Sequence, residues 1–194
     1  MNSNNDTILW DSLRNGDQSA LKKIYDQEFS FLFNYGKKIT SNQSLVEDSV
    51  QDLFIEIWNR RANLSPTDSI RRYMAVSLKR KIIRHLQKGQ KTSLKEDFST
   101  YDFAAEISIE SKLISDESHT EKLLMLKSGF SKLPARQKEV IYLKYYSGMD
   151  NESIAETMDI TNQSVRNLVH KAIKALTEML QLIIFFVAMS TFYI

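Results

Sequence analysis

The stretch that decides the fold is "NESIAETMDITNQSVRNLVH", residues 151–170. Its apolar residues have the spacing of two short helices that cross at a turn, as in a helix-turn-helix. Asp159 stands where such turns commonly carry glycine, and aspartate tolerates the left-handed backbone conformation better than most residues. The side chains expected to point inward are Ile154, Ala155 and Met158 of the first helix, Ile160 of the turn, and Val165 and Leu168 of the second helix.

The outward face of the second helix is polar and cationic, with side chains able to bond base edges and phosphates in a major groove. These side chains are Gln163, Arg166, Asn167, His170 and Lys174. The preceding stretch, "LPARQKEVIYLKYYSG" (133–148), has a proline suited to a helix's first turn and a glycine suited to a helix's end. A complete small helical domain that binds DNA is therefore predicted.

The rest of the chain is also predicted to be helical. Its 194 residues include only five Gly and two Pro, and no segment alternates apolar and polar residues for long enough to indicate a sheet. The absence of cysteine excludes disulfides, thiol catalysis and cysteine-ligated zinc. The polar start, "MNSNNDT", predicts no secretory signal, so we expect a cytoplasmic protein of the all-α class.

The distribution of charge predicts two small domains joined by a flexible linker. Residues 69–95 hold nine basic side chains and no acidic ones, whereas residues 96–121 hold eight carboxylates against Lys112. We expect a first domain at 8–90, an acidic linker at 91–121, the helix-turn-helix domain at 122–180 and an apolar tail at 181–194.

The basic segment "SIRRYMAVSLKRKIIRHLQKGQK" (69–91) has a helical period. Its apolar face consists of Met74, Ala75, Leu78, Ile82 and Leu86, and its polar face of Tyr73, Ser77, Arg80, Lys81, Arg84 and Lys88. Such a cationic strip suits a phosphate backbone, and its single aromatic side chain could stack on an unpaired base. An ordinary solvated face or an anionic membrane surface is an alternative interpretation.

A second amphipathic segment, "LVEDSVQDLFIEIWNRR" (45–61), carries Asp48, Asp52 and Glu56 one helical turn apart. Like charges at this spacing repel by about 0.2–0.5 kcal/mol per pair. The opposite side forms a core stripe of Val46, Val50, Leu53, Phe54 and Ile57, while Ile55 lies among the carboxylates. An isoleucine ringed by charge is typical of a protein interface, and a simply solvated helix is the alternative.

In this order, the acidic helix, the basic helix, the linker and the helix-turn-helix with its leading Leu-Pro resemble a bacterial sigma factor of the extracytoplasmic-function (ECF) type, within the sigma-70 family. The likeness covers about 10–88 and 125–178, and "RNGDQSALKKIYD" (14–26) resembles the family's opening helix. It implies a transcription initiation factor that binds core RNA polymerase, reads the minus-35 and minus-ten promoter elements and traps the melted strand. The linker would thread toward the polymerase active-site channel.

The resemblance also implies a role for individual residues. Core polymerase would be bound by Asp48, Gln51, Asp52, Ile55 and Glu56. The minus-ten element would be bound by Arg60, Arg61, Tyr73, Ser77, Arg80, Lys81, Arg84 and Lys88, with residues 60–69 as the loop that captures a flipped base. The minus-35 element would be bound by Thr161, Asn162, Gln163, Ser164, Arg166, Asn167, His170, Lys171 and Lys174. Family members usually carry Asn at the position of Arg80 and Asp or Asn at that of Arg84, which leaves the preferred minus-ten sequence open.

No enzyme is expected. The three histidines are scattered without metal-ligand spacing, and the isolated glycines form no phosphate-binding loop. We therefore predict no catalytic residue, no metal, no cofactor and no small-molecule substrate. The expected partners are core RNA polymerase, promoter DNA and an anti-sigma protein. A conventional helix-turn-helix regulator and a peripheral membrane or adaptor protein remain alternatives.

The tail "LQLIIFFVAMSTFYI" (180–194) is strongly apolar but shorter than the roughly 20 residues that a membrane-spanning helix needs. We expect it to continue the last helix and to pack on the protein or on a partner. An inhibitory role, in which it covers a polymerase-binding surface, is a hypothesis.

Overall fold

The computed structural model of the chain describes residues 3–89, Phe103 and residues 127–191, and within these ranges the side chains of 3, 4, 88, 89, 180 and 182–191 are not described. The described residues form helices and short connections, with no strand among them. The predicted all-α class is confirmed. The acidic linker predicted at 91–121 lies outside the described residues apart from Phe103.

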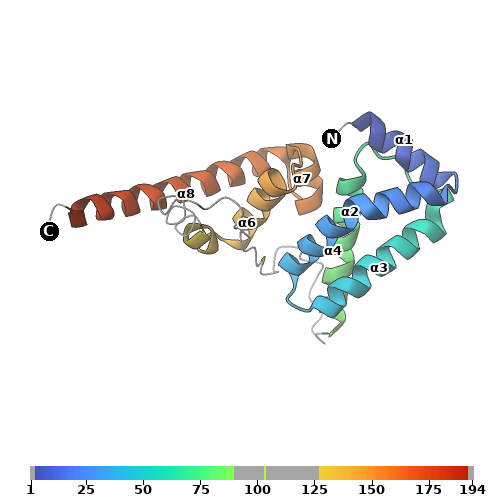
Figure 1. The fold of residues 1–194 in the computed structure, drawn as a ribbon, viewed down its shortest axis with the longest axis horizontal. Helices are drawn as coiled ribbons and strands as arrows, with labels where there is room; N and C mark the ends of the chain where they lie inside the picture. Colours follow the sequence, from blue (N-terminus) through green and yellow to red (C-terminus); the bar gives the residue numbers. More distant parts are fainter. Residues whose placement is uncertain (1–2, 90–102, 104–126, 192–194) are drawn as a thin grey trace.

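The amino-terminal helices pack into one bundle (Figure 1). They are α1 (Ser3–Arg14), α2 (Gln18–Ile39), α3 (Gln43–Arg60), a 3-10 turn (Arg61–Asn63) and α4 (Ile70–Gly89). Local side chains set two of the helix starts: the Asp17 carboxylate accepts a hydrogen bond from the Ser19 N–H, and the Asn42 side chain accepts one from the Leu45 N–H.

The bundle buries the apolar stripes that the sequence predicts for α3 and α4. Val46 and Val50 of α3, and Met74, Leu78 and Ile82 of α4, are all fully buried. A Cβ atom added to Gly36 of α2 would lie 2.6 Å from Cγ1 of Val46, so only glycine allows α2 to approach the other helices this closely.

The carboxy-terminal helices form a second bundle. They are the helical residues 127–131, α6 (Ala135–Ile141), a π-helical turn (Tyr142–Tyr146), α7 (Asn151–Met158) and α8 (Asn162–Thr191). Pro134 is the N-cap of α6, and Gly148 has a φ of 66° at the turn that precedes α7. The core residues predicted for the helix-turn-helix are buried or packed on the core, including Ile154, Met158 and Val165 with no exposed surface.

Helix α8 is much longer than a recognition helix requires and extends beyond the rest of its bundle (Figure 1). The prediction that the apolar tail continues the last helix is confirmed as far as Thr191. The predicted packing of the tail's side chains falls outside the described residues. Within the ranges described here, no helix is both long and apolar enough to cross a membrane.

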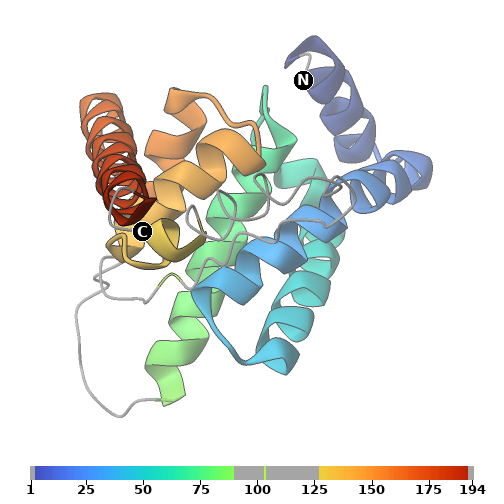
Figure 2. The ribbon, with the colours of Figure 1, turned by 60° about the vertical axis from the view of Figure 1, so that its left-hand side comes forward.

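The two bundles lie against each other, with α7 beside α4 (Figures 1 and 2). At the centre of this contact the Lys79 ammonium lies 3.0 Å from Oε1 of Glu139 and donates to the Thr157 carbonyl at 3.2 Å. The Tyr35 hydroxyl of α2 donates to the same Glu139 oxygen at 2.7 Å. Burial lowers the pKa of Lys79, whereas the neighbouring Glu139 carboxylate opposes that shift.

Two arginines from the start of α4 extend the contact. Arg71 forms an ion pair with buried Glu28 of α2 and donates to the Ser147 carbonyl of the second bundle at 3.0 Å. Arg72 pairs with Asp68 and, across the contact, with Glu156 at 3.1 Å. The first turn of α4 thus binds residues of both bundles and joins one bundle to the other.

Phe103 is the one described residue between the two bundles, and it is fully buried. Its ring centroid lies 6.1 Å from that of Tyr35 in the first bundle and 5.8 Å from that of Tyr142 in the second. The linker at 91–121 was predicted to be flexible, and these ring contacts hold it against both bundles at Phe103.

Candidate polymerase and DNA interfaces

The outward face of α3 carries the residues predicted to bind polymerase. Asp48, Gln51, Asp52, Ile55 and Glu56 are all exposed. Ile55 is 57% exposed, a large value for an isoleucine, while Leu53, Phe54 and Ile57 on the opposite side are buried. The face therefore has an apolar centre with a charged and polar rim, as the helical period predicts.

The carboxylates of this face are partly neutralised from within the molecule. The Lys81 ammonium of α4 lies 2.6 Å from Oε1 of Glu56 and 3.7 Å from Oδ2 of Asp52. Asp48 forms no ion pair with any residue that the structure describes. The stacked negative charges are thus relieved by a lysine that the sequence analysis assigned to a different surface.

A cavity of about 440 Å³ lies between α3 and α4. It is lined by Leu53, Glu56, Ile57, Arg60, Leu64, Tyr73, Ser77, Arg80, Lys81, Arg84 and His85. Six of the eight residues predicted for the minus-ten element therefore come together around one cavity. Two polar lining residues were not predicted for this surface: His85, which lies next to Arg84 in the chain, and Glu56, which was assigned to the polymerase-binding face.

The other two predicted residues are placed differently. The Arg61 guanidinium lies over the Trp58 ring at 4.3 Å and donates to the Trp58 carbonyl at 2.9 Å, so its side chain is directed to α3. The side chain of Lys88 falls outside the described residues.

Helix α1 supports the loop that leads into α4. The Trp10 indole N–H donates to the Ser65 carbonyl at 2.9 Å, and an Asp6 carboxylate oxygen accepts from the Ile70 N–H at 3.0 Å. The Trp10 ring also packs at 4.9 Å on the half-buried ring of Tyr73. These contacts hold the predicted capture loop and its aromatic residue in place.

The helix-turn-helix has the predicted backbone at its turn. Asp159 ends α7 in the left-handed region, with φ and ψ both 53°. At the start of α7 the Asp150 carboxylate accepts from the Ser153 N–H at 2.7 Å, and this hydrogen bond holds the pKa of Asp150 below its usual value. At the start of α8 the Thr161 hydroxyl accepts from the Ser164 N–H at 3.1 Å.

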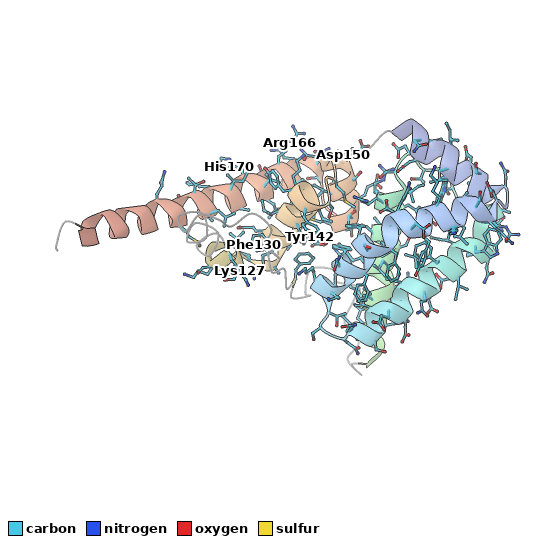
Figure 3. All side chains as sticks on the ribbon, viewed as in Figure 1. Lys127, Phe130, Tyr142, Asp150, Arg166 and His170 are labelled. Carbon is cyan, nitrogen blue, oxygen red and sulfur yellow. The ribbon has the colours of Figure 1, made fainter. Side chains whose placement is uncertain are left out.

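The outward side of α8 is open to solvent. The predicted minus-35 residues are all exposed except Ser164, which is half-buried. Figure 3 shows Arg166 and His170 on the edge of α8 that faces away from Phe130 and Tyr142. Among them Lys174 lies 3.8 Å from Glu178, while Arg166 and Lys171 form no ion pair within the described residues. No group of three or more potential metal ligands occurs in the part of the chain that the structure describes.

An exposed helix-turn-helix, together with a separate cavity lined by basic side chains, is typical of DNA-binding transcription factors. The family model described as "Sigma-70 region 2" matches residues 24–92, and that described as "Sigma-70, region 4" matches residues 123–176. Together these matches span more than half of the chain. The chain belongs to the sigma-70 family and is of the ECF type: it is an initiation factor that directs RNA polymerase to promoters.

Known proteins that are similar to this chain include sigma factors. The ECF RNA polymerase sigma factor SigL of Mycobacterium tuberculosis is 21% identical over 165 residues, which cover 85% of this chain and 91% of that protein. The structure of CnrH in complex with the cytosolic domain of CnrY has a TM-score of 0.59 at 19% identity and covers 91% of this chain and 97% of that one. The sigma factor RpoE of Bartonella quintana, solved with the anti-sigma factor NepR, has a TM-score of 0.52 at 19% identity, with 82% and 96% covered.

Proposed function

We propose that the first domain docks on a basic surface of core polymerase through Asp48, Gln51, Asp52, Ile55 and Glu56. The arrangement of apolar Ile55 within an exposed acidic rim supports this assignment, because protein interfaces commonly combine an apolar centre with a polar rim. We also propose that the chain has a first domain at 8–90, a linker at 91–121 and a second domain at 122–180. The two family matches, at 24–92 and 123–176, support these bounds.

The cavity between α3 and α4 is assigned to the melted minus-ten strand. The single observation that carries this assignment is the convergence of Arg60, Arg80 and Arg84 with the Tyr73 ring around one cavity. Arginines there neutralise phosphates, and an aromatic ring stabilises a stacked base by about 1–3 kcal/mol. Arg61, turned toward Trp58, has a lesser role than the sequence analysis gave it.

The minus-35 element is assigned to the first turns of α8. Gln163, Arg166 and Asn167 are exposed near the start of the helix, where a recognition helix reaches base edges. Lys171 and Lys174 follow Asn167 by about one and two turns and suit phosphates. The minus-35 and minus-ten elements are separated along the duplex, whereas the two domains are joined by the contact around Lys79 and Glu139. This contact must therefore open before each domain can reach its own element.

A protein partner that holds this closed arrangement is also proposed. The structural neighbour RpoE was solved with an anti-sigma factor, and an anti-sigma protein is expected here. Binding, with no catalytic residue and no cofactor, accounts for the proposed activity, since phosphodiester chemistry belongs to the polymerase. Such a role places the chain in the cytoplasm, where transcription occurs.

The decisive experiment adds the purified chain to bare core polymerase and measures transcription from a genomic fragment library. Promoter-specific initiation that depends on the chain is expected. Binding of duplex DNA by the chain alone, with no change in transcription by the polymerase, would instead indicate a conventional helix-turn-helix regulator. Association with anionic vesicles without either activity would indicate a membrane adaptor.

A further inference from the structure

Lys81 lies at the junction of two surfaces that the proposed function keeps separate. It belongs to the cationic strip of α4 and lines the cavity, yet its ammonium is bound by Glu56 and Asp52 of the acidic face. The lysine side chain is 13% exposed, whereas those of Glu56 and Asp52 are 59% and 56% exposed. The carboxylates therefore remain accessible to a partner, while the lysine is held by them.

A basic partner surface would compete with Lys81 for these carboxylates. A carboxylate oxygen that turns to a cation on the partner leaves the lysine ammonium without its closest acceptor. Lysine carries a compact charge on a flexible four-carbon stem, so the ammonium can then move to another anion. The cavity that Lys81 already lines offers a place for such an anion.

We propose that Lys81 couples the two surfaces: Glu56 and Asp52 hold it in the free chain, and polymerase docking releases it to a DNA phosphate at the cavity. This inference rests on the proposed function. Because Glu56 also lines the cavity, docking would turn a negative group away from the site and free a positive one at the same time. By thermodynamic reciprocity, DNA in the cavity strengthens polymerase docking by the same factor.

Arg84 provides the matched control. It lies on the same strip about one turn from Lys81, lines the same cavity and is exposed, but it forms no ion pair with any described residue. Loss of its charge removes a cavity cation without freeing a carboxylate of the acidic face. Any general effect of lowering the positive charge of α4 is thus the same in both variants.

The first test measures the affinity of the full chain for core polymerase without DNA. Lys81→Met frees both carboxylates from their internal competitor, so it should bind polymerase about 2- to 5-fold more tightly than wild type, the range expected for exposed ion pairs. Arg84→Met should bind as wild type does. Melting temperatures, expected to be nearly unchanged, verify that both variants are folded.

The second test uses the free chain and a labelled single strand of 20 thymidines at several salt concentrations. The quantity measured is the slope of log affinity for the strand against log salt concentration. Arg84→Met should reduce this slope both in the wild-type chain and in a chain that carries Asp52→Asn with Glu56→Gln. Lys81→Met should reduce the slope only in the chain that carries Asp52→Asn with Glu56→Gln, by roughly 0.7 for the one released cation.

The outcomes separate the two proposals. A wild-type chain that does not bind polymerase overturns the proposed function. A wild-type chain that binds polymerase, with Lys81→Met binding no more tightly, leaves the proposed function standing and overturns the coupling. Equal slope changes for Lys81→Met in both backgrounds also overturn it, because the lysine would then contact DNA without release.

Discussion

The helices α4 and α8 both carry basic side chains proposed to bind DNA, but they use their charges differently. On α4, Arg71, Arg72, Lys79 and Lys81 are all paired with carboxylates from elsewhere in the fold. On α8, Arg166, His170 and Lys171 are exposed. A count of basic residues therefore overstates the charge that α4 offers to DNA, and part of that charge holds the fold together.

The strongest test of this difference removes a paired lysine from α4. Lys79→Met leaves the buried Glu139 carboxylate without its cation, and breaking a buried pair typically costs about 3–5 kcal/mol. We expect a marked loss of stability, with separation of the two domains, measured by denaturant unfolding and small-angle scattering. Arg166→Met on α8 should change stability by less than about 0.5 kcal/mol.

The same loss should be largely repaired when the partner charge is removed as well. Lys79→Met with Glu139→Leu replaces a buried pair by apolar groups, which is often neutral or stabilising. A double variant as unstable as Lys79→Met would show that the ion pair is not the cause.

The next test acts on the carboxylates of the outward face of α3, of which Asp52 pairs with Lys81 of α4 and Asp48 does not. Asp48→Lys with Asp52→Lys should place like charges against a basic polymerase surface, which costs about 3 kcal/mol or more across an interface. Core affinity should fall steeply, as measured by fluorescence titration. DNA binding through α8 should be retained.

The structure also supplies a cleaner version of this variant. Asp52→Lys places a second lysine beside Lys81, so some stability is lost through repulsion within the chain. Asp48→Lys with Gln51→Lys avoids that contact, because neither residue pairs with Lys81. Wild-type core affinity in this folded variant would exclude the outer face of α3 as the docking surface.

On α8, where the basic side chains are exposed, single substitutions should change the affinity for particular promoter sequences. Arg166→Ala and Gln163→Ala should weaken minus-35 recognition by about 1–3 kcal/mol where they touch bases. Lys171→Ala should lower the affinity for all DNA sequences alike and should reduce the dependence of that affinity on salt concentration. Binding measured on a library of single-base variants distinguishes these patterns, and unchanged base preference in Gln163→Ala would contradict the proposed register.

The smallest expected effect concerns the support of α8 by α7. Asp150→Ala removes the cap of α7 and should cost about 1 kcal/mol of unfolding free energy. Because the pKa of Asp150 is lowered, this contribution is fully present above the unfolded value of 3.8 and is lost as pH falls through the lower folded value. Thermal melts at pH 7 and at pH 3 should therefore show a smaller difference between wild type and variant in acid.

Features that depend on local pattern could be predicted from the sequence. The buried stripe of α3 follows from the helical period, and the left-handed Asp159 follows from the spacing of the helix-turn-helix. The same period correctly places Ile55 in solvent and brings most of the predicted minus-ten residues to one face.

Features that depend on distant pairing could not be predicted. Lys79 and Glu139 are 60 residues apart, and each alone resembles an ordinary surface charge. Lys81 and Glu56 are 25 residues apart and were assigned to different surfaces for the same reason. Phe103 gave no signal in an acidic stretch, because one aromatic residue has no period. Tertiary packing alone determines which charges are paired.

The pairing of Lys79 with Glu139 has an evolutionary consequence. Each residue lies in a different domain, so a chimera that joins this first domain to the second domain of a relative would bury an unmatched charge wherever the relative lacks an acid at position 139. The two domains can therefore be exchanged freely only among relatives that preserve the pair. Positions 79 and 139 should change together during divergence, even though neither is assigned to polymerase or promoter contact.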